Sequence, residues 1–317
     1  MKANSAGQAN RAAGAASSAR AGRIGTALRG RGGAVGTLPL VAPSVLLLLV
    51  WSVVPLVMTL WFSFRRYNLL NPLIHGFAGW SNYRFLFLDP ALISSLVVTL
   101  VLVGAVLIIT VGLGAVLAAV FETGFPGRGV ARVLMISPFF VMPTVSALIW
   151  KNLLMNPVNG LFAWIAHGVG LPPLDWFAAI PLTAIVLIVA WEWLPFAFLI
   201  LMTALQSLDE EILEAARLDG AGPIALFRFV QLPHLGRSIS VVVMIETIFL
   251  LGIFAEIYVT TAGGPGVATT NLAFMIYQRA LLAFNVGSAS AAGVIAIVLA
   301  NIMSAFLINT VAKRLDV

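Results

Sequence analysis

The sequence contains no cysteine. This absence excludes a disulfide-stabilised scaffold, a zinc site built on thiolates and a cysteine nucleophile. Charge is also scarce, because Asp, Glu, Lys and Arg together make up only 9% of the 317 residues. A typical soluble domain carries about 25% charged residues. With so few charges, a large soluble domain could not cover its surface with polar groups.

Hydrophobic residues are correspondingly abundant, at 61% of the chain. Long apolar runs of this kind are typical of a membrane protein that crosses the bilayer several times. A transmembrane β-barrel would instead show alternating segments of about ten residues, and the sequence has none. The composition therefore predicts an all-α integral membrane protein.

Lysine occurs three times, as Lys2, Lys151 and Lys313. A phosphate-binding P-loop has the pattern G-x-x-x-x-G-K-[ST], and none of the three lysines follows a glycine. The chain therefore has no P-loop of its own, and we expect no bound cofactor.

Residues 1–38 are rich in Ala, Gly and Ser, and they carry six basic residues and no acid. Such a segment cannot bury enough apolar surface to fold alone. It also resembles an Arg-rich transit peptide, whereas the long apolar run that follows does not suit a cleaved signal peptide. We interpret the segment as a flexible cytoplasmic tail.

Six runs with few or no charges are long enough to cross a hydrocarbon core of ~30 Å, which takes about 20 helical residues. They define a predicted domain over residues 39–312, followed by a cytoplasmic tail over 313–317. The runs are Leu38–Phe64, Ala91–Phe121, Val133–Trp150, Pro181–Leu208, Ser238–Thr260 and Ala280–Ala312, the last one starting near Ala289.

Basic residues are distributed unequally between the two sides that six spans would define. Thirteen of the 18 lie on the side of the termini and five on the other side. The positive-inside rule therefore places both termini in the cytoplasm, although Arg65 and Arg66 argue the other way. The net charge of +6 needs no nucleic-acid partner, because these positives lie where anionic lipid headgroups would be.

The most polar stretch of the chain, residues 207–237, lies between the fourth and fifth runs. Ser207 with Glu210 predicts a capping box, and Gly220 suits the end of that helix. Pro223 suits the start of a second short helix that we expect Pro233 to end. Two short amphipathic helices indicate either a docking element or a helix that rests on the membrane surface.

The residues of this loop resemble the EAA loop of bacterial ABC-importer permeases. The match consists of Glu214-Ala215-Ala216-x-x-Asp219-Gly220-Ala221, Phe227 and Val230-x-Leu232-Pro233. The family has Ile where Val230 stands. Two further segments resemble carbohydrate-type permeases of the maltose-permease MalF-like half of the pair, and the resemblance covers roughly residues 39–312. They are Gly79-Trp80-Ser81-Asn82-Tyr83 and Glu256-Ile257-Tyr258-Val259-Thr260 with Gly263-Gly264-Pro265.

The resemblance implies a type I ABC importer permease, with six transmembrane helices and a cytoplasmic EAA coupling loop. It implies a second homologous permease subunit, two copies of a separate ABC ATPase and a periplasmic solute-binding protein as partners, in the bacterial inner membrane. The run at 191–195 is similar to that of sorbitol and mannitol permeases, which implies a polyol or sugar as the solute.

The resemblance also implies roles for particular residues. It assigns docking of the binding protein to Gly263, Gly264 and Pro265. It assigns coupling to the ATPase to a larger set in the loop, namely Glu214, Ala215, Ala216, Asp219, Gly220, Phe227 and Pro233.

A candidate solute path follows from Trp191, Glu192 and Trp193 inside the fourth run. A carboxylate at that depth usually faces a cavity or a partner, and tryptophan faces pack against the C–H surfaces of sugars. Adjacent positions on a helix lie ~100° apart, so we expect one tryptophan beside Glu192, with Asn301 as a further polar candidate. The alternative is a structural Glu192 bonded to a neighbouring helix or to the partner permease.

Two other function classes compete with this interpretation. An integral membrane enzyme would need clustered ligands or a nucleophile, but the three histidines lie far apart and G-x-S-x-G is absent. A proton-coupled secondary transporter could use Glu192, Glu246 and Glu256 as a relay. Such a transporter would have no reason to carry an ATPase-docking loop.

Overall fold

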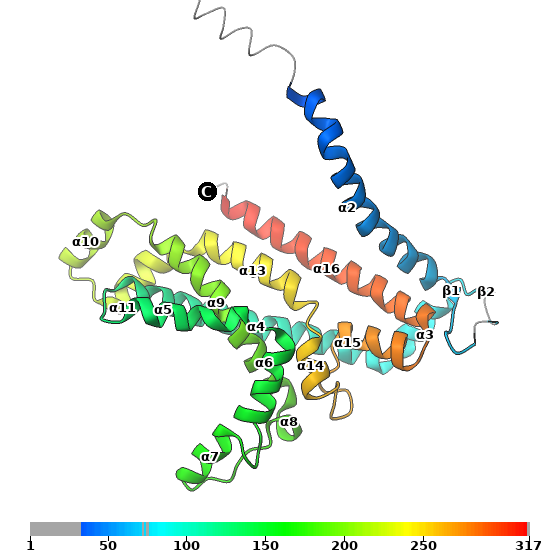
Figure 1. Ribbon diagram of the computed structural model, residues 1–317. Helices are drawn as coiled ribbons and strands as arrows, with labels where there is room; N and C mark the ends of the chain where they lie inside the picture. Colours follow the sequence, from blue (N-terminus) through cyan, green and yellow to red (C-terminus); the bar gives the residue numbers. More distant parts are fainter. Residues whose placement is uncertain (1–32, 72, 74–75, 316–317) are drawn as a thin grey trace, which may run out of the picture. The chain divides into compact units, whose positions relative to one another are not determined.

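The computed structural model describes residues 33–71, 73 and 76–315, so most of the predicted tail at 1–38 lies outside the described residues. The chain divides into two compact units, residues 1–57 and 58–317, and the packing described below lies within the second. The elements are almost all helical (Figure 1), and in chain order they are α2 (Gly33–Ser63), β1 (Arg65–Arg66), β2 (Gly76–Phe77), α3 (Ser81–Leu88), α4 (Pro90–Glu122), α5 (Arg128–Ile136), η1 (Ser137–Phe140), α6 (Pro143–Ile149), η2 (Trp150–Leu154), α7 (Leu161–Gly168), α8 (Trp176–Ala179), α9 (Pro181–Leu205), α10 (Glu210–Leu218), α11 (Pro223–Leu226), η3 (Phe227–Gln231), α12 (Leu232–His234), α13 (Gly236–Leu250), α14 (Ala255–Thr260), α15 (Leu272–Tyr277), η4 (Gln278–Leu282) and α16 (Val286–Leu315).

Four of the described helices are long and apolar enough to cross a membrane, and two bent helix pairs raise the number to six when each pair counts as one span. The four long helices are α2, α4, α9 and α16. They confirm the first, second, fourth and sixth predicted runs.

The third predicted run, Val133–Trp150, falls in a bent helix pair and is not one continuous helix. Residues 128–140 and 143–154 form two helical segments that meet at 108°. Val141 and Met142 between them have extended backbones, and Pro143 begins the second segment. Proline disfavours the helical conformation for the residue before it, which accounts for the break.

The fifth predicted run, Ser238–Thr260, is also interrupted. Helix α13 ends at Leu250 and α14 starts at Ala255, while residues 223–234 form a bent pair with α13 at 65°. The side-chain amide of Asn271 donates a hydrogen bond to the carbonyl oxygen of Ile253 in the break. That bond satisfies a backbone group that would otherwise be unpaired inside the bilayer.

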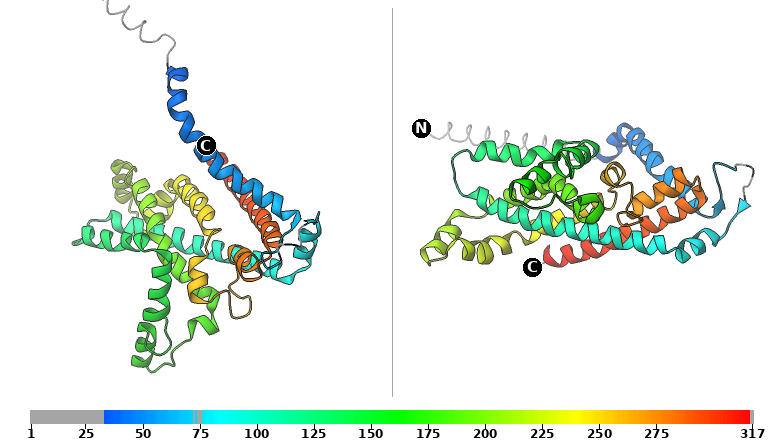
Figure 2. Two further views of the ribbon diagram at one scale, coloured as in Figure 1. Left: turned by 45° about the vertical axis from the view of Figure 1, so that its right-hand side comes forward. Right: turned by 90° about the horizontal axis from the view of Figure 1, so that it is seen from below.

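Helix α4 packs along α9, and this pair forms the centre of the second unit (Figures 1 and 2). Alanines and aromatics at the interface, among them Ala118, Phe121, Ala197 and Phe198, are almost fully buried. A Cβ atom at Gly114 would lie 3.1 Å from the Cβ of Ala197. A small residue at this point therefore allows the two backbones to approach closely, as at many membrane helix contacts.

One end of the second unit is closed by α3, the β1–β2 hairpin and the start of α16. Tyr83 Oη donates to Ser63 Oγ at 2.8 Å, and Asn82 Nδ2 donates to the carbonyl oxygens of Ser63 and Arg65 at 2.8 and 3.0 Å. A Cβ atom at Gly287 would lie only 2.3 Å from the Arg65 oxygen. In this structure, Asn82 and Tyr83 of the Gly79–Tyr83 segment tie these elements together.

Candidate coupling loop and intramembrane polar sites

The first helix of the coupling loop, α10, begins after Asp209, whose backbone is extended. The predicted capping box is wrong: Ser207 Oγ donates instead to the carbonyl oxygen of Ala204 at 2.7 Å, and no side chain of the described residues caps α10 at Asp209. Ser207 already belongs to the turn that follows α9. The two acids Glu210 and Glu211 still lie in the first turn of α10, where the helix dipole favours negative charge.

The turn between α10 and α11 follows the prediction. Gly220 has a φ of +85°, and Ala221 N donates to Ala216 O at 3.0 Å across the end of the helix. This left-handed conformation suits glycine after a helix C-terminus. Pro223 occupies the first position of α11.

Pro233 does not end the second helix of the loop, contrary to the prediction. The helix continues from α11 through the π-helical η3 into α12 and ends at His234. The π-helical turn over Phe227–Gln231 directly precedes Leu232 and Pro233, and such turns accommodate a change in backbone hydrogen bonding. The loop therefore leads into α13 through the bend at Leu235 and Gly236.

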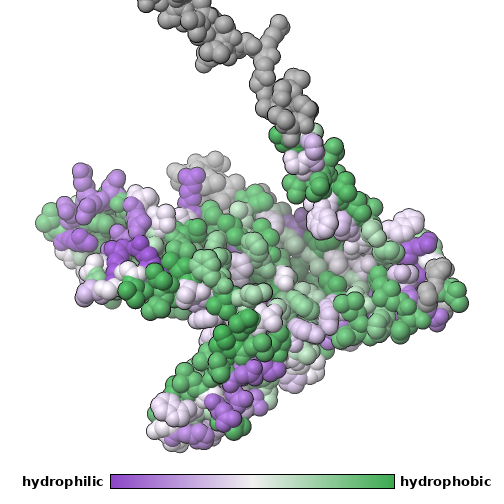
Figure 3. Space-filling view, viewed as in Figure 1, coloured by the Kyte–Doolittle hydropathy of each residue, from purple (hydrophilic) through white to green (hydrophobic). Residues whose placement is uncertain are grey.

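The two coupling helices enclose a cavity of about 370 Å³ against the end of α4. Leu213 and Leu226 are buried at its wall, whereas Leu218, Ile224 and Phe229 are 89%, 83% and 72% exposed. Hydrophilic side chains gather over α10 at the same end of the unit (Figure 3). Large apolar side chains among charged ones indicate a surface suited to another protein.

The predicted coupling residues are distributed over this surface. Phe227 lines the cavity and is half-buried. The described structure leaves Glu214, Ala215, Asp219, Gly220 and Pro233 exposed and Ala216 half-buried. Among the described residues the one ion pair joins Arg279 and Asp89, so Glu214 and Arg217 form no fixed pair.

The three intramembrane glutamates are buried. Glu192 on α9, Glu246 on α13 and Glu256 on α14 are 6%, 0% and 2% exposed. Thr110 Oγ1 donates to Glu246 Oε2 at 2.6 Å, which ties α4 to α13. The Glu192 carboxyl lies next to the carboxyl of Glu256 and the hydroxyl of Ser146 on α6.

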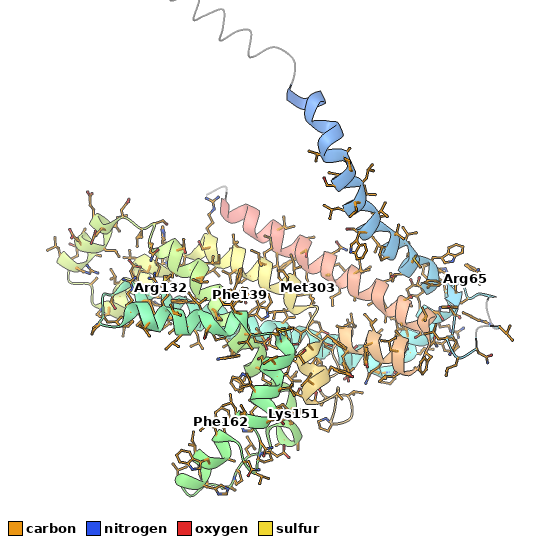
Figure 4. All side chains as sticks on the ribbon, in the orientation of Figure 1. Arg65, Arg132, Phe139, Lys151, Phe162 and Met303 are labelled. Carbon is orange, nitrogen blue, oxygen red and sulfur yellow. The ribbon has the colours of Figure 1, made fainter. Side chains whose placement is uncertain are left out.

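The other residues of the predicted solute path lie apart. Trp191 packs edge-on against Trp150, with ring centroids 5.9 Å apart. Trp193 contacts Phe139, which is labelled in Figure 4, and Phe249 at centroid distances of 6.0 and 5.2 Å. Asn301 is exposed and its Nδ2 donates to the carbonyl oxygen of Ile297. The described chain thus places each side chain in a different environment.

The loop after α14 is held by threonine side chains that sequence reasoning did not single out. Thr261 and Thr269 share a hydroxyl hydrogen bond of 2.7 Å, and Thr269 Oγ1 donates to the carbonyl oxygen of Gly264 at 2.9 Å. Gly263 has a φ of +87°, and a Cβ atom there would lie 2.6 Å from Thr270 Oγ1. These contacts fix the conformation of the Gly263–Pro265 turn.

No group of three or more His, Asp or Glu residues in the described ranges is arranged to hold a metal ion.

Comparisons with known proteins agree with this architecture. The family model for "binding-protein-dependent transport system inner membrane component" matches residues 108–317. The chain is 31% identical to a probable ABC transporter permease, y4oQ of Sinorhizobium fredii, over 84% of this chain and 86% of that one. It is 29% identical to the sn-glycerol-3-phosphate permease UgpA of Agrobacterium fabrum, over 87% and 94% of the two chains. It is 32% identical to the trehalose/maltose permease MalF of Thermococcus litoralis, over 79% and 85%.

A solved structure shares the fold. A chain of a bacterial ABC transporter that imports the acidic polysaccharide alginate superposes with a TM-score of 0.74 at 19% identity, covering 87% of this chain and 94% of that one.

Proposed function

Because this chain belongs to the family of binding-protein-dependent transport system inner membrane components, we propose that it is the transmembrane permease subunit of an ATP-driven carbohydrate importer. The observation that carries the proposal is the pair of coupling helices with exposed Leu218, Ile224 and Phe229, on a chain with four continuous candidate spans and two bent helix pairs. The relatives named for glycerol-3-phosphate and trehalose/maltose transport support a carbohydrate-type solute. The finer proposal is a polyol of the sorbitol or mannitol type.

The partners in this proposal are a second homologous permease, two copies of an ABC ATPase and a periplasmic solute-binding protein. The alginate transporter has been solved in complex with its pentasaccharide-bound periplasmic protein, which supports the last of these. The ATPase would contact the loop through Glu214, Ala215, Ala216, Asp219 and Gly220. Phe227 and Pro233 would hold the second coupling helix beneath the spans.

The decisive test is reconstitution of this chain with its partners in liposomes. Uptake of a polyol or sugar should require ATP, the ATPase and the binding protein, and should be unaffected when a protonophore collapses the proton gradient. Uptake that follows the proton gradient and continues without the ATPase would instead identify a secondary transporter.

The membrane orientation is part of the proposal: both termini in the cytoplasm, with domain limits at residues 1–38, 39–312 and 313–317. Since the chain has no native cysteine, Ser5→Cys and Asn159→Cys can each be labelled alone. In intact spheroplasts, an impermeant thiol reagent should label Asn159→Cys and leave Ser5→Cys unmodified until the membrane is permeabilised. The reverse pattern would contradict the orientation.

The turn at Gly263, Gly264 and Pro265 is proposed to dock the binding protein. The hydrogen bond between Thr261 and Thr269 holds this turn in shape and supports the proposal. A photocrosslinker at Val267, which is 45% exposed, should join the permease to the solute-loaded binding protein, whereas one at Val158 on another loop serves as the control. Equal crosslinking at both positions would contradict specific docking at this turn.

The solute path is proposed to pass α9, with Glu192 as a hydroxyl acceptor, Trp191 or Trp193 as an apolar platform and Asn301 as a further polar contact. The burial of Glu192 against α6 and α14 means that a solute could reach it only after these helices separate. The proposed path is therefore open in a conformation other than the one described.

A further inference from the structure

Three elements that are distant in the sequence bring polar side chains together inside the second unit. Helix α14 packs against both α6 and α9. Ser146 comes from α6, Glu192 from α9 and Glu256 from α14, and all three are at most 6% exposed. We call these three residues the cluster, and Glu192 and Glu256 the carboxyl pair.

The hydrogen-bonding capacity of this cluster is not filled. Glu192 Oε1 and Ser146 Oγ are buried and have no hydrogen-bond partner among the described residues. Buried polar atoms without a partner are rare in folded proteins and call for a bound species or a functional explanation. The carboxyl groups of Glu192 and Glu256 lie side by side, so a species that fills the unused hydrogen-bonding positions must interact favourably with both carboxyls.

Among the described residues the one ion pair joins Arg279 and Asp89, so no cation there forms an ion pair with either carboxyl. Lys151, labelled in Figure 4, donates through Nζ to the carbonyl oxygen of Val259 at 2.9 Å rather than to Glu256. The other titratable groups on the elements packed around α9 and α14 lie elsewhere. Glu246 accepts from Thr110, Glu122 lines the coupling cavity at the end of α4, and Asp175 caps α8. Tyr258 contacts Phe254 and Tyr277, Arg128 and Arg132 lie on α5, and Arg237 lies in the first turn of α13.

Two ionised carboxylates cannot lie in contact in a low-dielectric interior without a counter-charge, so one of them stays protonated or a cation lies between them. Calcium takes six to eight oxygen ligands. Two carboxyls and one hydroxyl supply too few, whereas a proton needs only one oxygen on each side.

We propose that Glu192 and Glu256 share one proton that fastens α14 to α9. In the packed state the O–H group of one carboxylic acid donates to the other carboxylate, and Ser146 can donate to the oxygen left over. When α14 separates from α9, the O–H bond breaks, the proton passes to water and two carboxylates remain. The same separation would expose the Glu192 oxygens to solute hydroxyls, but the shared proton does not depend on that role.

Difference infrared spectroscopy of the whole transporter in lipid nanodiscs, followed during a pH titration, tests the proposal directly. The C=O stretch of a protonated carboxylic acid should be present at neutral pH, and the same band should vanish in Glu192→Gln and in Glu256→Gln. Glutamine keeps the shape and can donate to the remaining carboxylate, so both variants should still co-purify with the partner subunits. Glu246→Gln is the matched control and should leave this band unchanged.

A second readout follows the conformational change. If opening requires loss of the proton, ATPase activity of the wild type should rise about tenfold per pH unit over the range where the pair titrates, and either glutamine variant should flatten that profile. Ser146→Ala should shift the band without removing it.

Three results would overturn the proposal. If the wild type shows two separate bands, and Glu192→Gln removes one while Glu256→Gln removes the other, each glutamate holds its own proton. A band absent from the wild type at all pH values, with infrared shifts of the carboxylates on adding sodium or calcium, would mean a bound metal cation. An unchanged band in both variants would mean that the pair holds no proton.

Discussion

Replacing Gly220 by proline is expected to reduce ATP-driven uptake strongly while the chain still inserts into the membrane. Gly220 has a φ of +85°, whereas proline fixes φ near −65°, so the turn between α10 and α11 cannot form. Proline also removes the N–H that donates to Arg217 O at 3.0 Å. The two coupling helices would lose their relative orientation, and we expect uptake in proteoliposomes to fall by about tenfold or more, a loss of ~1.4 kcal/mol or more in coupling.

Gly222→Ala is the matched control for this experiment. Gly222 has a φ of −70°, and an added Cβ there would meet no described atom within 4 Å. The Gly222→Ala variant should transport at the wild-type rate, while Gly220→Ala should show an intermediate loss because alanine tolerates a positive φ only at a cost of about 1 kcal/mol.

Reversing the exposed charge with Glu214→Lys should reduce uptake per ATP hydrolysed without altering membrane insertion. Wild-type uptake by Gly220→Pro that co-purifies with the ATPase would refute the proposed role of this turn.

Replacing Gly287 by alanine is expected to destabilise the end of the second unit. The new Cβ would lie 2.3 Å from the carbonyl oxygen of Arg65 and 3.0 Å from Asn82 Nδ2. The first of these neighbours is backbone, so α16 or the β1 strand must move. Overpacking of this kind typically costs about 1–3 kcal/mol. We expect a lower midpoint of thermal unfolding in detergent and a smaller yield of folded protein.

Gly293→Ala on the same helix provides the control, because its Cβ would lie 3.5 Å from Thr59 Cγ2, an ordinary contact distance. Gly293 lies in the interior of α16, where alanine is more favourable than glycine by about 1 kcal/mol, so this substitution should not lower the unfolding midpoint. A lower midpoint for Gly287→Ala would then reflect the steric clash. Equal unfolding midpoints for the two variants would contradict the close approach of α16 to Arg65.

The continuous spans could be predicted from the sequence alone, because a run of about 20 apolar residues is long enough to cross the membrane as a helix. It also predicted the turn at Gly220, where a local rule about helix ends applies. The break at residues 141–142 has a local cause in Pro143, whereas the break at residues 251–254 was missed because a tertiary partner satisfies the backbone there. The partner at the second break is Asn271, which lies 18 residues beyond Ile253 in the sequence.

The pairing of Glu192 with Glu256 was inaccessible to sequence reasoning for a similar reason. The two residues are 64 positions apart, and no local periodicity relates α9 to α14. Each glutamate alone predicted a polar site within the membrane, and both side chains are buried in the structure. Which of them meet depends on the bend that directs α6 toward α14, and that bend follows from Pro143 and its neighbours.

The hydrogen bond from Asn271 to Ile253 has a consequence for how the chain is made. Asn271 follows Ile253 by 18 residues, so the fifth span would carry an unpaired carbonyl group if it entered the membrane before Asn271. A carbonyl in that state costs several kcal/mol in lipid, and it stays in contact with water or the insertion machinery until its partner arrives. Residues 236–271 would therefore enter the bilayer as one unit during biosynthesis, and the loop that holds Gly263 would take shape in the same step.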